Sequence, residues 1–133
     1  MNLFFWRKAK RYQVEDPTGQ GFWQVVDTSE RPGKTYVVAT FSKYLDGAKE
    51  QAEAMAQRLT DSERHWPTAR QLQARYPGWF YSLTDTHQRG MSVVLISMRC
   101  PNAAEEMTII WRSLNRGAAE PERFKVTTLE DYE

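Results

Sequence analysis

The sequence predicts an α+β fold: a two-layer sandwich in which an antiparallel sheet of five or six strands carries two long helices and one short helix on one face. The first observation is that segments rich in β-branched and aromatic residues occur in pairs, separated by loops that contain glycine. The second is that each pair is followed by apolar residues at the 3.6-residue period of a helix. Since a hairpin with one helix buries its apolar face poorly, we expect the two units to share one sheet.

The chain has 133 residues, which suits a single domain, and it begins with a basic arm, residues 1–11. Residues 11–15 are predicted to form a short strand, which the turn residues of DPTGQG end. The first β-β-α unit, 21–62, contains a hairpin of Phe22–Asp27 and Lys34–Phe41. The second of these strands is apolar on both faces, so we expect it to lie centrally in the sheet.

The helix of the first unit is expected to be capped by the side chain of Asp46. A short linking helix, 66–77, is predicted because Thr68 and Gln71 have the spacing of a capping box. The buried stripe of the first long helix is predicted to be Ala48, Ala52, Met55, Ala56 and Leu59.

The second β-β-α unit is predicted over 78–117, with a strand after Gly78 and another over Met91–Met98. Its helix is expected to start at Asn102 and Glu105 and to end at Gly117. The C-terminal segment, 118–133, contains a last strand, Arg123–Thr128, whose charged side chains suit a sheet edge, and an acidic tail. The predicted core is Trp23, Phe41, Met55, Leu59, Val94, Ile96, Met107, Ile110 and Leu114.

The two units align in a constant register that matches Gly21 with Gly78, Gly33 with Gly90, and Val37 with Val94. This pattern predicts an internal β-β-α repeat. Hairpin-plus-helix units are common enough to look alike by chance, and that alternative stays open.

The layout GFWQVVDT…YVVATF…A…A…L of Gly21–Leu59 resembles hairpin–helix segments of small accessory proteins of phages and plasmids. The resemblance implies a bacterial mobile-element context and a role in binding, and sometimes blocking, a larger host machine. It brings no catalytic residues with it.

The net charge and the cysteine content of the chain limit the classes of partner and compartment that we expect. The formal net charge is +1, so no global field attracts nucleic acid or an anionic membrane. Cys100 is the single cysteine, which suits a reducing compartment, and no apolar run approaches the length of a membrane span. We therefore expect a cytoplasmic protein that does not bind a membrane.

Chemistry-bearing residues are few. His65, His87 and Cys100 lack the spacing of a metal site, and no glycine-rich phosphate loop is present. A metal site assembled in space from Asp85, His87 and Cys100, and a nucleophile pair of Cys100 and His87 in which the thiol pKa is lowered, remain alternatives. We expect no enzymatic activity, no cofactor and no metal.

Binding of another protein or protein complex is the function the sequence favours, because aromatic residues and arginine are enriched at interfaces. The predicted anchors, which are ring-bearing residues with neighbouring arginines, are Trp66, Arg70, Arg75, Tyr76, Trp79, Phe5, Trp6 and Arg7. A homodimer formed through an edge strand is a further possibility.

Nucleic-acid binding is the alternative, because basic residues interleaved with rings can track a phosphate backbone and stack on bases. The residues predicted for that role are Arg7, Lys8, Lys10, Arg11, Arg64, Arg70 and Arg75.

Overall fold

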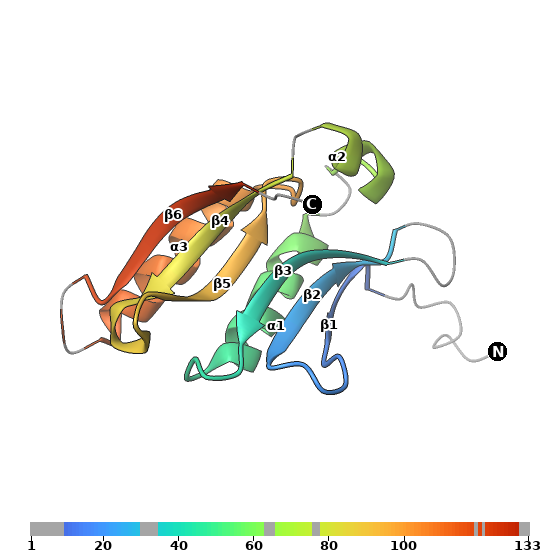
Figure 1. Cartoon of the computed structure of the whole chain (residues 1–133). Coiled ribbons are helices and arrows are strands. Elements are labelled where there is room, and N and C mark those ends of the chain that lie inside the picture. Colours follow the sequence, from blue (N-terminus) through green and yellow to red (C-terminus); the bar gives the residue numbers. More distant parts are fainter. Residues whose placement is uncertain are drawn as a thin grey trace.

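The computed structural model describes residues 10–29, 35–62, 66–75, 78–118, 120 and 122–130. These residues form an open antiparallel sheet of six strands, in the order β1-β2-β3-β5-β4-β6, and three α-helices (Figure 1). The predicted α+β class is confirmed. The elements are β1 (Tyr12–Glu15), β2 (Phe22–Asp27), β3 (Tyr36–Ser42), α1 (Ala48–Asp61), α2 (Ala69–Arg75), β4 (Trp79–Asp85), β5 (Met91–Ser97), α3 (Ala103–Arg116) and β6 (Phe124–Glu130).

The two long helices cover the same face of the sheet and lie behind the strands in Figure 1. α1 packs on β1, β2 and β3, and α3 packs on β4, β5 and β6. Arg58 of α1 and Glu106 of α3 join the helices through an ion pair of 2.7 Å between Nη2 and Oε1. The short helix α2 lies at the end of the sheet toward which α1 runs. The long helices and the sheet therefore enclose one shared core.

The core contains the residues predicted for it. Trp23 and Leu114 are half-buried and pack against its side. The fully buried members of the predicted set are Phe41, Met55, Leu59, Val94, Ile96, Met107 and Ile110. The apolar periodicity of strands and helices therefore placed these residues correctly, although the predicted set omits other buried residues such as Tyr12, Leu83 and Phe124.

The long helices begin without the capping side chains that the sequence predicts. The predicted start of α3 at Asn102 is confirmed, whereas the N-cap of α1 is Gly47, not Asp46. Gly47 and Asn102 have the left-handed backbone conformation, with φ of 73° and 58°, and no N-cap side chain makes a capping hydrogen bond in either helix. In each strand-to-helix connection, a serine hydroxyl accepts a hydrogen bond from the backbone amide two residues later. Ser42 accepts from Tyr44, and Ser97 accepts from Arg99. The capping box of α2 is confirmed: the Thr68 amide donates to Gln71 Oε1 at 2.9 Å, and the Gln71 amide donates to Thr68 Oγ1 at 3.3 Å.

The two halves of the sheet have the same strand register. In each hairpin the register shifts at one place, after Val25 in β2 and after Leu83 in β4. β3 and β5 meet antiparallel at the centre, so an approximate twofold axis between them relates the halves. The matching pairs are Trp23–Phe41 and Val25–Ala39 in the first half, and Tyr81–Ile96 and Leu83–Val94 in the second.

The edge strands obey the same symmetry although they come from opposite ends of the chain. Tyr12 of β1 lies opposite Asp27, and Phe124 of β6 lies opposite Asp85. β1 precedes its hairpin in sequence, whereas β6 follows the helix of its unit. Each repeat is therefore a three-stranded unit with one helix, one strand larger than the predicted β-β-α unit.

The predicted register of the repeat is wrong in detail. Matching Gly21 with Gly78 would align Trp23 with Phe80, whereas Trp23 is equivalent to Tyr81 in the sheet. A slip of one residue moves a side chain to the opposite face. The cause is the number of residues between the two strands of each hairpin, which is set by residues 28–35 in the first half and 86–90 in the second. Because these lengths differ, no constant offset relates the two halves.

Candidate binding surfaces

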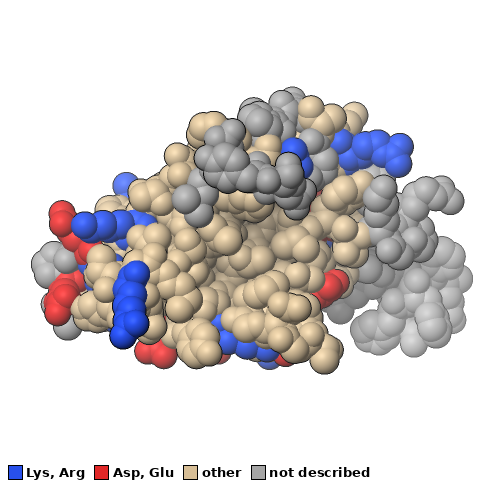
Figure 2. All heavy atoms as spheres, viewed as in Figure 1, with Lys and Arg blue, Asp and Glu red and all other residues tan. Residues whose placement is uncertain are grey.

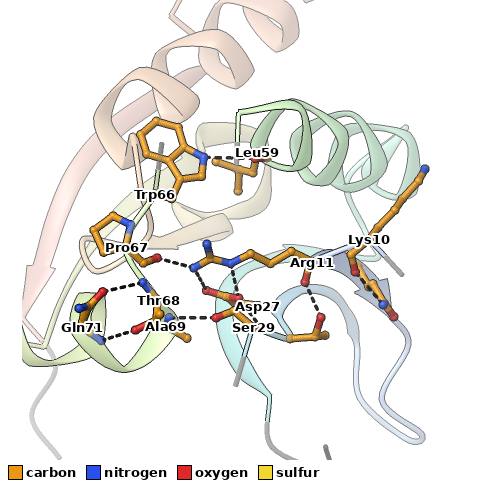
Figure 3. Close-up of polar contacts among 12 residues, drawn as sticks. Lys10, Arg11, Asp27, Ser29, Leu59, Trp66, Pro67, Thr68, Ala69 and Gln71 are labelled. Carbon is orange, nitrogen blue, oxygen red and sulfur yellow. Dashed lines mark hydrogen bonds and ion pairs between the residues drawn. The ribbon is translucent and has the colours of Figure 1, made fainter. Parts of the chain in front are cut away.

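Arg11 and Asp27 form a buried ion pair that also holds the segment before α2 (Figure 3). Arg11 Nε and Nη2 donate to the two Asp27 oxygens at 2.8 and 2.9 Å, and Nη2 also donates to the Pro67 carbonyl at 2.6 Å. The Ser29 hydroxyl, beside this pair, accepts the Ala69 amide at 3.0 Å. Arg11 was proposed to contact phosphate in the nucleic-acid alternative, but its guanidinium makes these internal contacts.

Trp66, predicted as a partner anchor, is half-buried against the core. Its Nε1 donates to the Leu59 carbonyl at 3.2 Å, near the end of α1. The ring lines a cavity of about 360 Å³ together with Cys100 and Pro101, at the start of α3. Trp66 therefore fills a site between the end of one long helix and the start of the other.

The remaining predicted anchors are spread over the molecule. Arg70 is exposed on α2, Arg75 is the last residue of that helix, and Trp79, at the start of β4, is 37% exposed. Lys10 is exposed, and its Nζ donates to Gln57 Oε1 at 2.9 Å. Six predicted residues lie outside the described residues: Phe5, Trp6, Arg7, Lys8, Arg64 and Tyr76.

A second ion pair repeats the first at the opposite end of the sheet. Arg123 Nε and Nη2 each donate to Asp85 at 2.9 Å, and the His87 amide donates to Asp85 Oδ1. The guanidinium lowers the pKa of the Asp85 carboxyl by more than burial raises it. This pair is absent from the residues predicted from sequence. The available signal was the repetition of RYQV at 11–14 as RFKV at 123–126, and of Asp-Thr at 27–28 as Asp-Thr at 85–86.

The alternatives that involve Cys100 do not form a site. Cys100 follows β5 and is 3% exposed, whereas His87 precedes β5, so a whole strand separates them. Burial raises the pKa of the Cys100 thiol well above its ordinary value, which is the opposite of the predicted lowering. His87 Nε2 lies 2.8 Å from Glu120 Oε2. Among the described residues, no three His, Cys, Asp or Glu side chains lie close enough to hold a metal ion.

The sheet face opposite the long helices is uncharged across its middle. One row across it contains Gln24, Thr40, Leu95, Ser82 and Thr127, each opposite the next in the pairing register. Figure 2 shows this face as a hollowed surface of uncharged residues, with charged side chains along its margins. Ser82 is buried, and its hydroxyl is hydrogen-bonded to that of Ser92. The other members of the row are half-buried or exposed, so they offer hydroxyl, amide and aliphatic groups to a partner.

A groove of about 590 Å³ lies between α3 and β6, lined mostly by apolar side chains that include Met107, Trp111 and Val126. Trp111 Nε1 donates to the Phe124 carbonyl at 2.8 Å, which ties β6 to α3. The equivalent groove between β1 and α1 has a more polar lining, which includes Lys10, Glu53 and Gln57 beside Tyr12 and Val14. Homodimerisation through an edge strand stays a prediction, and β6 is the edge on which to test it.

No helix of the described residues is long and apolar enough to cross a membrane. Comparison of the chain with models of protein families, with curated proteins and with solved structures found no match.

Proposed function

We propose that this protein is a non-enzymatic binding module whose partner, another protein, docks on the sheet face opposite α1 and α3. The observation that carries the proposal is the uncharged, half-buried pair Thr40 and Leu95, which lie opposite each other at the middle of that face. Interface centres are depleted of charge, whereas a nucleic-acid site needs cations to meet phosphates. Protein binding is therefore favoured over the nucleic-acid alternative.

The ion pairs support the same choice. Arg11, Arg58 and Arg123 each bind a carboxylate of this chain that is nearly fully buried. A cation paired in this way has little to gain from a phosphate, because leaving the buried carboxylate unpaired is costly. We therefore assign these arginines a structural role, which is to neutralise buried carboxylates.

The finer form of the proposal is a cytoplasmic protein of a bacterium, phage or plasmid that inhibits the larger protein it binds. Its support is the resemblance of Gly21–Leu59 to phage and plasmid accessory proteins and the single, buried cysteine.

The test is capture of the partner from a bacterial lysate treated with nuclease. The original chain is compared with a variant that carries a new charge on the sheet face. Leu95→Lys is expected to abolish capture, because a partner cannot pair or hydrate a lysine at the centre of the interface. Ala54→Lys adds the same charge to the exposed surface of α1 and is expected to retain the partner. Loss of all captured protein on nuclease treatment, or equal capture by both variants, would contradict the proposal.

A further inference from the structure

The approximate twofold axis relates two sites at opposite ends of the molecule, one of which holds the chain's own Trp66-Pro67 segment. At that site, Trp66 and Pro67 lie between Leu59 near the end of α1 and the start of α3. Two hydrogen bonds hold the segment: the Trp66 indole donates to the Leu59 carbonyl, and Arg11 donates to the Pro67 carbonyl (Figure 3).

The equivalent site is built from equivalent residues. Leu114 has the same position in α3 as Leu59 has in α1, counted from the start of each helix. Arg123 and Asp85 repeat the geometry of Arg11 and Asp27. Leu45 leads into α1 as Cys100 leads into α3, and each amide donates to the carbonyl three residues before it.

This second site is a pocket of about 360 Å³, lined by residues that include Tyr44, Leu45, Asp85, Leu114 and Arg123. The Arg123 side chain is 30% exposed, against 10% for Arg11. Within the described part of the chain, the Arg123 guanidinium makes its hydrogen bonds to Asp85, whereas that of Arg11 also binds the Pro67 carbonyl. Among the described residues, the hydrogen bond from Arg11 to the Pro67 carbonyl therefore has no counterpart at Arg123.

We propose that this pocket binds an extended segment of a partner protein in which a tryptophan is followed by proline. The bound segment places its ring over Leu45 and Leu114, its indole N–H on the Leu114 carbonyl, and the proline carbonyl on Arg123. The chain's own Trp66-Pro67 segment makes these contacts at the equivalent site, where it binds the Leu59 carbonyl and Arg11. The pocket is separate from the sheet face of the proposed function, so either site can fail without the other.

The probe is a synthetic peptide with the sequence of residues 63–71, ERHWPTARQ, titrated into the isotope-labelled full chain and followed by NMR. Saturable shifts are expected at Leu45, Asp85 and Leu114, with a dissociation constant below about 1 mM. The same peptide with alanine in place of tryptophan is expected not to bind.

Two variants test the pocket, and the second of them separates binding from folding. Arg123→Lys keeps the charge but loses the fork of donors, and we expect affinity to fall at least about tenfold. Tyr44→Ala removes a ring that is 73% exposed, so it leaves the fold intact and is expected to weaken binding. Lys125→Ala, a change of an exposed cation outside the pocket, is the matched control and should bind as the original chain does.

Three outcomes would overturn the proposal: no saturable shift up to about 1 mM peptide, shifts confined to Arg11 and α2, or equal effects of Arg123→Lys and Lys125→Ala. Shifts confined to the Arg11 end would mean that the peptide only displaces the chain's own Trp66.

Discussion

At the scale of single residues, the same ion pair is used twice, and both copies brace an edge strand. Arg11 and Arg123 each precede an aromatic residue, and each guanidinium lies over the ring of that neighbour at 5.1 and 4.9 Å. Each arginine reaches an aspartate at the end of the neighbouring strand. The edge strands are thus held by side chains as well as by backbone hydrogen bonds.

The Asp85 pair predicts a pH dependence of stability. The folded-state pKa of Asp85 is below the ordinary value of 3.8, so the pair contributes fully at neutral pH and its contribution is lost as the pH falls through the folded-state value. Asp85→Asn is expected to lower the free energy of unfolding at neutral pH, and the gap to the original chain should narrow in acid. Denaturant titrations at a series of pH values measure this gap.

Glu53→Gln is the control, because Glu53 is 57% exposed and lies 4.0 Å from Lys49. A surface pair of this kind is worth less than about 1 kcal/mol. Curves for Asp85→Asn that stay parallel to those of the original chain down to acid would contradict the assigned role of Asp85.

At the scale of elements, the left-handed residues before α1 and α3 determine how each helix leaves its strand. Gly47 adopts φ of 73° at no steric cost, whereas Asn102 adopts φ of 58° as one of the few other residues that tolerate it. The two connections share most of their other hydrogen bonds, including those from Leu45 to Ser42 and from Cys100 to Ser97. The backbone turn, more than a capping side chain, starts these helices.

Gly47→Ala is therefore expected to destabilise the protein by about 1 kcal/mol, the cost of a Cβ in the left-handed region. A clash contributes nothing, because the nearest atom to the added Cβ, Glu50 Oε2, lies 4.0 Å away. Asn102→Gly, at the equivalent position, should be neutral or slightly stabilising. Thermal unfolding of the two variants measures the difference, and a neutral Gly47→Ala would refute the explanation.

Much of the element order could be predicted from sequence, since the period of the apolar residues indicates which side chains are buried. The roles of side chains whose contacts are distant in sequence could not be predicted. Trp66 looked like an exposed anchor because its local sequence is polar and loop-like, and only the fold brings Leu59 and Cys100 around it. Arg11 likewise looked available until Asp27 and Pro67 were placed beside it.

At the scale of the whole molecule, the two repeats form one cooperative structure. Buried residues of both halves belong to one continuous cluster, and Arg58 and Glu106 join the helices across the axis. β3 and β5 lie at the centre of the strand order, and β1 and β6 lie at its ends. Protection from hydrogen exchange should accordingly be highest at the centre and lowest at both edges.

Phe41→Ala tests this cooperativity. The substitution empties a fully buried position in the first half and is expected to cost about 3–5 kcal/mol. Exchange measured by mass spectrometry should accelerate in β4 and β5 as much as in β2. Val126→Ala, at a position that is 40% exposed, is the mild control. Faster exchange confined to the first half would show that the repeats unfold separately.

The order in which the strands occur along the chain has a consequence for biosynthesis. As the polypeptide emerges from the ribosome, the first repeat has every strand and its helix once Asp61 is outside, whereas the second waits for residues 124–130. In a nascent chain halted after α3, β4 would be an unpaired edge strand, and the Asp85 carboxylate would lack its partner Arg123. Such a product should be a substrate for chaperones and quality-control proteases.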